Sequence, residues 1–154
     1  MDLLLCKKKI SAERCKELIE KYEPNGIQMK DSDYSIYYRH DFKSHELSNE
    51  VLQYLPQFIG HKISIRWYFT KYEYGGFIKE HSDGHVNIGS QSSTHTLLIY
   101  LNDDYKGGEL KINNIGSLHP ATGSIIIMNS DLSHSVNPII KGNKYLLRSD
   151  ITFK

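Results

Sequence analysis

Cysteine is scarce in this sequence, with two residues, Cys6 and Cys15, among 154. Two cysteines near one end of the chain cannot build a disulfide framework or a cysteine-rich zinc site. Charge of one sign is also lacking, because 19 Lys and Arg nearly balance 18 Asp and Glu and leave a net charge of +1. A dedicated nucleic-acid binder is normally far more basic, since phosphate contacts supply most of its affinity.

Long hydrophobic runs are absent as well. The apolar run 3–5 is too short for a signal peptide. The three lysines at 7–9 follow this run, whereas the positive charges of a signal peptide precede its apolar region. No segment approaches the length of a transmembrane helix. We therefore expect a soluble, intracellular, cytoplasmic protein that has no membrane partner. Its 11 Tyr, 5 Phe and 1 Trp can build a packed interior, so we expect one folded domain over residues 1–154.

Helical spacing is confined to the first third of the chain. Ser11 can cap a helix over residues 12–22, and the turn that begins at Pro24 ends it. A second helix is predicted over about 44–55. Cys15 falls on the apolar stripe of the first helix, so we expect it to be a buried free thiol.

From residue 62 onward the pattern changes to short strands that are separated by Gly, Asn, Asp and Pro turns. Helices followed by six or more strands predict a mainly β fold of the α+β class. In such a fold an antiparallel sandwich or barrel is buttressed by helices on one face. The polar stretch 84–93 is predicted to be a mobile loop. The expected strands are 34–38, 63–69, 94–101, 110–112, 124–128 and 144–153.

His81 and Asp83 stand out among the eight histidines and their neighbours. Residues two apart on a strand point to the same face, so this imidazole and this carboxylate can occupy adjacent corners of a metal polyhedron. A third ligand has to come from a distant strand, and His134 is the candidate. Two histidines and one carboxylate on one triangular face, with three open positions, form the arrangement of Fe(II) oxygenases. The His-x-Asp pair is weak evidence alone, because zinc binding or a structural role also explains it.

The other histidines have simpler interpretations. His85 follows His81 by four residues, which is a helical metal spacing, but the neighbouring glycine and the strands around it place it in a loop. We expect His85 to be exposed to solvent. His95 and His119 flank strands and are expected at the surface.

Two polar segments near aromatic strands are also candidates for the rim of a site. Residues 39–41, Arg-His-Asp, either contact a substrate or form a polar strand end, and the second interpretation is favoured. Arg66 and Trp67 can line the mouth of a barrel. A tryptophan in so apolar a strand is more often a core residue, and we expect that for Trp67.

Five sequence motifs follow one another in a fixed order. They are Tyr-x-x-Gly before His-x-Asp, a strand that ends in Tyr-Leu-Asn, Gly-Gly-Glu, Pro-x-x-Gly before an apolar strand, and a distal His followed by Gly-x-Lys-Tyr. They occupy residues 72–83, 96–102, 107–109, 120–123 and 134–145. With these motifs, the chain from Trp67 to Lys154 resembles the Fe(II)/2-oxoglutarate-dependent dioxygenases, and specifically their prolyl 4-hydroxylase-like branch.

The resemblance implies a fold and a metal centre. The fold is a double-stranded β-helix, a jelly-roll or cupin-like barrel, with 61–154 as the β-helix core and 1–60 as helical support. The resemblance implies that His81, Asp83 and His134 bind Fe(II). It further implies 2-oxoglutarate and O2 as co-substrates, with ascorbate as an additional cofactor candidate.

The same resemblance suggests how 2-oxoglutarate is held. In prolyl 4-hydroxylases the cation for its far carboxylate lies ten residues past the distal His, and that position is Lys144 here. Tyr72 falls where the family has a tyrosine that hydrogen-bonds the co-substrate. Residues 148–154 resemble in part the Arg-x-Asn-x-Thr-Phe-Arg ending of AlkB-type nucleic-acid demethylases, whose first Arg binds the co-substrate. We favour Lys144 as the anchor, with Arg148 as a second contact, as a substitute, or as one half of an ion pair with Asp150.

The activity that the resemblance implies is hydroxylation of a C–H bond with release of succinate and CO2. We expect a peptidyl residue such as proline as the substrate, so the expected partner is a peptide or a small molecule. Oxidation of a free amino acid or another small metabolite is the next alternative. An AlkB-like demethylase follows, and the near-neutral charge makes a nucleic-acid partner unfavourable. A non-catalytic, cupin-like metal-binding protein is the alternative from another class, and the triad together with Lys144 counts against it.

Overall fold

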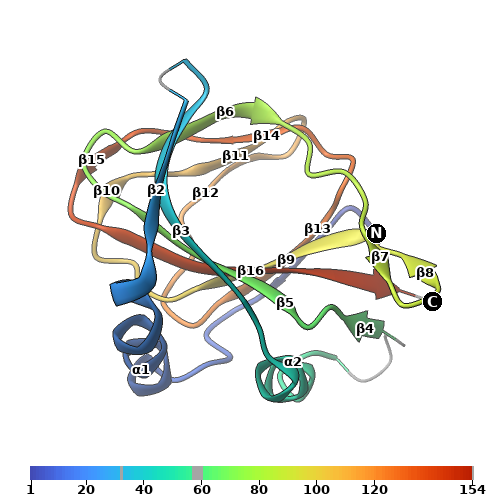
Figure 1. The fold of residues 1–154 in the computed structure, drawn as a ribbon. Coiled ribbons are helices and arrows are strands. Elements are labelled where there is room, and N and C mark those ends of the chain that lie inside the picture. Colours follow the sequence, from blue (N-terminus) through green and yellow to red (C-terminus); the bar gives the residue numbers. More distant parts are fainter. Residues whose placement is uncertain (32, 57–60, 154) are drawn as a thin grey trace.

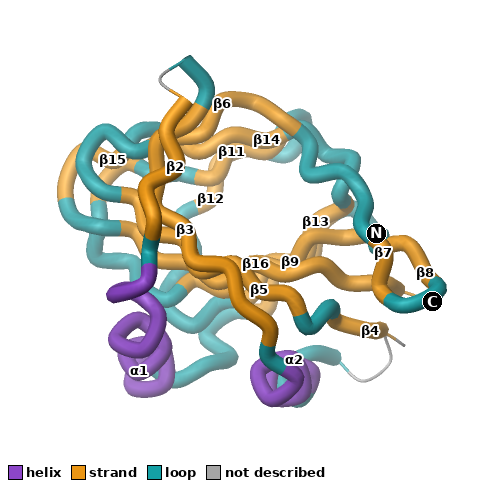
Figure 2. Tube along the Cα trace, in the orientation of Figure 1, coloured by secondary structure: helices purple, strands orange, loops and turns teal. Residues whose placement is uncertain are grey.

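The computed structural model describes residues 1–31, 33–56 and 61–153 of the chain. Its strands follow one antiparallel path that curls over, so that two layers face each other, and two helices lie under one layer (Figures 1 and 2). The layer next to the helices contains, in spatial order, β1 (Leu3–Cys6), β13 (Ile125–Asn129), β9 (His95–Tyr100), β16 (Lys144–Phe153) and β5 (Arg66–Tyr72).

The long strand β3 (Ser35–Lys43) joins the two layers along one side. Its residues 38–43 pair with β5, and its residues 35–36 pair with the first strand of the second layer. The second layer contains, in spatial order, β6 (Phe77–His81), β14 (His134–Val136), β11 (Leu110–Ile112) and β12 (Gly116–Leu118).

Six shorter strands complete the sheets. β2 pairs with β3, β4 pairs with β16, and the remaining four form two separate two-stranded ribbons, β7 with β8 and β10 with β15. Their bounds are β2 (Ile27–Asp31), β4 (His61–Ile63), β7 (Asn87–Ile88), β8 (Gln91–Ser92), β10 (Lys106–Gly107) and β15 (Ile139–Lys141).

Both helices begin at a serine cap. In α1 (Ala12–Tyr22) the Ser11 hydroxyl accepts a hydrogen bond from the third backbone N–H of the helix at 3.1 Å, and in α2 (His45–Leu52) Ser44 does the same at 3.0 Å. A single 3₁₀ turn, η1 (Glu23–Asn25), follows α1. The second helix ends at residue 52 rather than 55, because the next backbone N–H groups bond three residues back and tighten the chain. Among the described residues, neither helix is long and apolar enough to cross a membrane.

Strand β9 shows why the fold has two cores. All six of its side chains are buried, because alternate residues face opposite sides of the layer. Leu97 and Ile99 belong to the core beneath the helices, together with Trp67, which was predicted to be a core residue. Leu98 and Tyr100 belong to a second core inside the barrel. The functional site therefore forms on the inner side of a layer whose outer side is sealed by α1 and α2.

Several expectations about single residues can be compared with this fold. Cys15 is a fully buried free thiol, as predicted, and His119 is exposed, as predicted. The prediction for His95 was wrong, because its side chain is 7% exposed. The N-terminal residue of the chain contacts it, and its ring nitrogens lie 2.7 Å from the Thr94 hydroxyl and 2.8 Å from the Met1 carbonyl.

The stretch 84–93 is more ordered than a plain loop, since it contains the hairpin of β7 and β8. His85 is exposed, as expected, and its Nε2 lies 2.8 Å from Asp131 Oδ1. The mainly β fold with helices against one face is confirmed. The first 60 residues supply β1, β2 and β3 as well as the two helices. The boundary that we expected at residue 60 falls on residues 57–60, which lie outside the described part of the chain.

Candidate active site

The three predicted metal ligands come together at one end of the inner layer. His81 ends β6 and His134 begins β14, and these two residues are direct partners in the antiparallel register. Asp83 follows His81 by two residues and turns inward between the two imidazoles. One potential ligand atom from each of the three lies within 4.8 Å of the others. The Oδ1 atom of Asp83 is 3.4 Å from His81 Nε2 and 3.5 Å from His134 Nε2.

Both imidazoles are oriented by backbone carbonyls. The Nδ1 atom of His81 lies 2.8 Å from the Lys79 carbonyl oxygen, and that of His134 lies 3.0 Å from the Leu132 carbonyl oxygen. Nδ1 therefore donates a proton to a carbonyl in each ring, and Nε2 keeps its lone pair for a metal. The ring centroids are 4.3 Å apart, and both Nε2 atoms face the same oxygen, Asp83 Oδ1.

Asp83 is held as an ionised carboxylate. Burial by itself raises its pKa, but Arg148 and the two histidines, which donate hydrogen bonds from Nε2 when that atom is protonated in the metal-free protein, lower the pKa to well below the usual range. The Thr96 hydroxyl donates to Oδ2 at 2.8 Å, which leaves Oδ1 directed toward the histidines. Two free imidazole nitrogens and one free carboxylate oxygen are the donor set of non-haem Fe(II) sites. The residues present therefore fit that metal.

A buried cation lies behind the tyrosines that line the closed end of the cavity. Lys144 is 0% exposed, and its Nζ donates to the Gly108 carbonyl oxygen at 2.8 Å. Three tyrosine rings surround this ammonium group, with centroids 5.3, 5.2 and 5.9 Å from Nζ for Tyr72, Tyr100 and Tyr105. Cation–π contacts of this kind partly replace the water that a buried ammonium loses.

No described carboxylate forms an ion pair with Lys144. Burial therefore lowers its pKa to about 7, and the charge of Glu109 opposes this only in part. Close by, the buried hydroxyls of Thr70 and Tyr100 have no hydrogen-bond partner among the described residues. A buried cation and unpaired hydroxyls at the end of a cavity fit the carboxylate of a small acid, because such groups are rarely left unsatisfied.

Arg148 lies four residues farther along β16, on the same inward face, but nearer to the mouth. Its side chain is 30% exposed, and one terminal nitrogen is 3.8 Å from Asp83 Oδ1 and 3.8 Å from Asp150 Oδ1. Its guanidinium carbon is 5.5 Å from the centroid of the Tyr68 ring. The ion pair with Asp150 that was considered from the sequence is thus present. Lys154, the last residue of the AlkB-like ending, lies outside the described residues.

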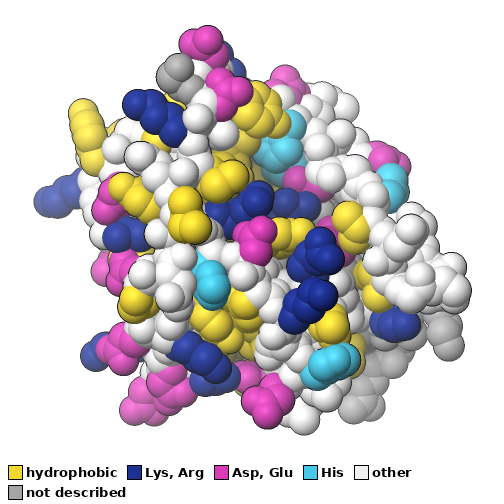
Figure 3. Space-filling view, viewed as in Figure 1, with side chains coloured by type: hydrophobic (Ala, Val, Ile, Leu, Met, Phe, Trp, Pro, Cys, Tyr) yellow, Lys and Arg dark blue, Asp and Glu magenta, His cyan; other side chains and the backbone are white. Residues whose placement is uncertain are grey.

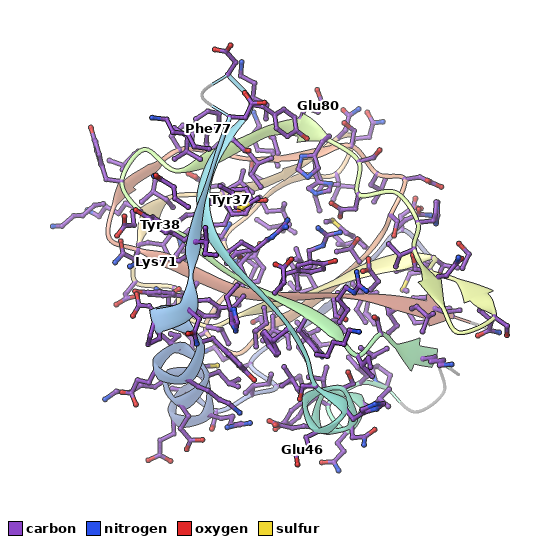
Figure 4. All side chains as sticks on the ribbon, viewed as in Figure 1. Tyr37, Tyr38, Glu46, Lys71, Phe77 and Glu80 are labelled. Carbon is purple, nitrogen blue, oxygen red and sulfur yellow. The ribbon has the colours of Figure 1, made fainter. Side chains whose placement is uncertain are left out.

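The cavity itself extends from the tyrosines at the closed end to the metal-ligand residues at the open end. Its wall includes two residues from β3 that the motifs did not indicate as site residues, Tyr37 and Arg39. Tyr37 stacks on Tyr72 at 5.5 Å between centroids, whereas its neighbour Tyr38 lies on the outer side near Lys71 (Figure 4). The alternation of side chains along β3 was the sequence signal that could have found these two residues, because it separates inward from outward positions.

Sequence reasoning also left two inward residues without a role, Thr96 and Tyr100. Both belong to the quoted central-strand motif, and the period of two puts them on the same face as each other. Which of the two faces of β9 points into the barrel depends on the layer above it, so the motif alone did not assign them.

One family model matches the chain. It describes the 2OG-Fe(II) oxygenase superfamily and covers residues 67–149, which is more than half of the sequence. No curated protein sequence is similar enough to the chain to count as a match.

Solved structures resemble the whole fold. A viral collagen prolyl hydroxylase from Paramecium Bursaria Chlorella virus-1, in complex with 2-oxoglutarate, has a TM-score of 0.76 at 17% identity, covering 98% of this chain and 95% of that one. A Pseudomonas putida prolyl-4-hydroxylase has a TM-score of 0.74 at 14% identity, with 99% and 93% covered. A Trichoplax adhaerens prolyl hydroxylase, in complex with a hypoxia inducible factor peptide fragment, has a TM-score of 0.76 at 15% identity, with 98% and 83% covered. These similarities confirm the double-stranded β-helix fold.

Proposed function

The chain belongs to the 2OG-Fe(II) oxygenase superfamily, and from this premise we propose that it hydroxylates a peptidyl residue, with proline as the leading candidate. It is a 2-oxoglutarate-dependent oxygenase that uses Fe(II). One observation carries the peptidyl assignment: nearly the whole chain shares its fold with prolyl hydroxylases, one of which holds a peptide. The open end of the cavity, beside His81 and Asp83, is where a substrate residue would enter.

We assign His81, Asp83 and His134 as the iron ligands. The chemistry that iron and 2-oxoglutarate supply when bound is the oxidation of a C–H bond by dioxygen, with release of succinate and CO2. The chain itself holds the three donor atoms in place. The two backbone carbonyls keep both Nε2 atoms directed inward, and Thr96 keeps one oxygen of Asp83 occupied and the other free.

We assign Lys144 as the anchor for the far carboxylate of 2-oxoglutarate, with Tyr72 and Tyr100 beside it. A carboxylate at the closed end would give this ammonium group the ion-pair partner that it lacks, and would give the Tyr100 hydroxyl a hydrogen-bond acceptor. Arg148 lies too near the metal-ligand residues to hold the far end of the same molecule. Its place is beside the substrate, at the mouth.

The proposal is tested by incubating the Fe(II) protein with 2-oxoglutarate, O2, ascorbate and proline-containing peptides. We expect formation of succinate and the gain of one oxygen atom by the peptide, both measured by mass spectrometry. The Asp83→Ala protein should form neither product, because it lacks the only carboxylate of the triad.

Matched reactions with free amino acids and with a methylated oligonucleotide make the outcome specific. Succinate and an oxidised product from a free amino acid, with no change in any peptide, would replace the peptidyl assignment by a metabolite oxygenase. Demethylation of the oligonucleotide alone would replace it by an AlkB-like activity.

A further inference from the structure

A second and wider cavity lies directly beside the mouth of the active site. Its volume is about 510 Å³, and Tyr68 lines both cavities, so the two adjoin at this side chain. We call it the basic groove, and it is formed by residues 43, 45, 62–66, 68 and 86–89 with Asp150. Apolar side chains of Ile65 and Val86 and the backbone of the β7–β8 hairpin form part of its wall.

The exposed charge in the basic groove is positive. Lys43, Lys62 and Arg66 all line it and are all exposed. None of the described carboxylates lies within ion-pair distance of these three side chains. The one acidic residue of the lining, Asp150, is only 2% exposed. The charge is local, because the whole chain carries only +1.

The register of the sheet places two of these cations directly opposite each other. Lys43 of β3 pairs with Arg66 of β5. Like charges in directly opposite positions of neighbouring antiparallel strands destabilise the sheet. Arg66 is near enough to the buried Asp150 for its charge to lower the pKa of that carboxyl, but Lys43 has no such partner among the described residues. An anionic group bound between the two cations would relieve their repulsion.

The positive charge continues to the metal-ligand residues. Guanidinium groups of Arg39 and Arg148 lie 5.3 and 5.5 Å from the centroid of the Tyr68 ring, and both residues line the active-site cavity. Arg39 is paired with Asp41 at 2.8 Å, so the unpaired charge is mainly that of the groove. Figure 3 shows Lys and Arg side chains gathered at the centre of this face and continuing below it toward the side of α2.

We infer that the basic groove binds acidic side chains of the peptide substrate, on one side of the residue that enters the active site. The inference rests on the proposed function and narrows its substrate to peptides with Asp or Glu near the target residue. Such carboxylates would pair with Lys43, Lys62 and Arg66, and an extended backbone would lie along the apolar wall.

A peptide fits the basic groove better than a nucleic acid does. Single-stranded nucleic acids are held by aromatic side chains that stack on bases, as well as by cations. Among the described residues that line the groove, Tyr68 is the only Tyr, Phe or Trp, and two guanidinium groups already lie near its ring; His45 offers one further, smaller ring. Three exposed cations without a larger basic surface suit a short acidic segment.

The test compares two labelled peptides of equal length, one with Glu around a central proline and one with Gln in the same places. Binding to the Fe(II) protein with 2-oxoglutarate is measured by fluorescence anisotropy without oxygen, so that no turnover occurs. We expect the Glu peptide to bind about tenfold more tightly at low salt. This difference should shrink to about twofold when the salt rises from about 0.05 to about 0.3 M.

Two triple variants of equal charge locate the effect. The groove variant is Lys43→Gln, Lys62→Gln and Arg66→Gln. The control is Lys16→Gln, Lys30→Gln and Lys106→Gln, whose lysines are exposed outside both cavities. The groove variant should lose the preference for Glu and the control should keep it. If the groove variant does not fold, Lys43→Gln alone relieves the repulsion from Arg66 and should still reduce the preference about twofold to threefold.

Three outcomes would overturn the inference. They are equal binding of the two peptides, a preference that survives in the groove variant, and an oligo-dT of matched charge that binds more tightly than the Glu peptide. The fate of the proposed function is read separately, from hydroxylation of the same peptides. Equal hydroxylation and equal binding would retain the proposed function and remove the inference. Charge-dependent binding without any hydroxylation would remove the proposed function and retain the basic groove only as a binding site for acidic peptides.

Discussion

The two cations on the inward face of β16 stand in opposite environments. Lys144 is fully buried among tyrosine rings and has no carboxylate partner within the described part of the chain, whereas Arg148 is partly exposed and has two, Asp83 and Asp150. They are four residues apart on one strand and point the same way. They differ in how deeply they lie in the barrel.

This difference shows what each position is suited to do. A buried, unpaired ammonium costs folding free energy until an anion binds, so Lys144 is a site that is incomplete without a ligand. Arg148 already lies within 3.8 Å of two carboxylates, so its charge is balanced without the co-substrate, and it can shape the mouth of the site. The cations of the basic groove differ from both Lys144 and Arg148, because they are exposed and no described carboxylate lies within ion-pair distance of them. Such cations suit weaker contacts that depend on salt.

The largest expected effect concerns affinity for 2-oxoglutarate. Lys144→Met should weaken it roughly 100-fold or more, because the far carboxylate would then be buried without a cation. Arg148→Met should weaken it by less than about tenfold. An anaerobic titration of the Fe(II) protein, followed by the visible charge-transfer band, measures both. The reverse order would assign Arg148 as the anchor and end the distinction drawn between the two cations.

The second expected effect is on stability, where the same substitution of Lys144 should be favourable. Lys144→Met should raise the free energy of unfolding by roughly 1–4 kcal/mol, because methionine fills the same space without a buried charge. Arg148→Met should change it by less than about 1 kcal/mol. Urea unfolding of the two variants without 2-oxoglutarate provides the comparison. A destabilised Lys144→Met protein would show that the tyrosine rings and the Gly108 carbonyl already compensate the charge.

The third expected effect concerns the metal-ligand residues at the mouth. Thr96→Val removes the hydrogen bond to Asp83 Oδ2 and should lower the affinity for Mn(II), used as a substitute for iron, about tenfold. Arg148→Met removes a cation near the same carboxylate and should not lower that affinity, since a positive charge opposes a metal ion. Electron paramagnetic resonance of free Mn(II) measures both. Equal losses would mean that Arg148 positions Asp83 as Thr96 does.

The smallest expected effect is a dependence on pH. With a pKa of about 7, Lys144 loses its proton as the pH rises, so the affinity for 2-oxoglutarate should fall about fivefold between pH 7 and pH 8. Because this pKa is below that of the unfolded chain, the unfolded state binds more protons above pH 7. Stability of the ligand-free protein should therefore rise from pH 7 toward about pH 10.

Lys144→Arg is the matched variant for this pH dependence, because a guanidinium group stays charged. Its affinity should be independent of pH over the same range. A wild-type affinity that is equally flat, measured by the same anaerobic titration, would mean that Lys144 remains protonated in the free protein.

Much of the candidate site could be predicted from local patterns. His81 and Asp83 share a face because they are two residues apart near the end of a strand, and the motif order put His134 on a later strand. The helix 12–22 and the strands 110–112 and 144–153 were predicted with the bounds that they have. These features depend on spacing and on turn chemistry, which a sequence shows directly.

Burial was harder to predict, because it depends on distant segments. His95 was expected at the surface, but it is buried and the N-terminal residue of the chain contacts it. The polar strand segment at 39–41 was expected to be a strand end, but Arg39 lines the cavity because β3 crosses from one layer to the other. The hairpin in 84–93 was missed because its strands are only two residues long.

The sequence by itself thus determined the alternation of each strand, the motif order and the identity of the three metal-ligand candidates. Only the tertiary structure decided that His134 pairs with His81, that Lys144 is buried while Arg148 is not, and that Lys43 lies opposite Arg66. The physical reason is the same in each case. Side-chain direction follows from the local backbone, but the environment that a side chain meets is set by strands far away in the chain.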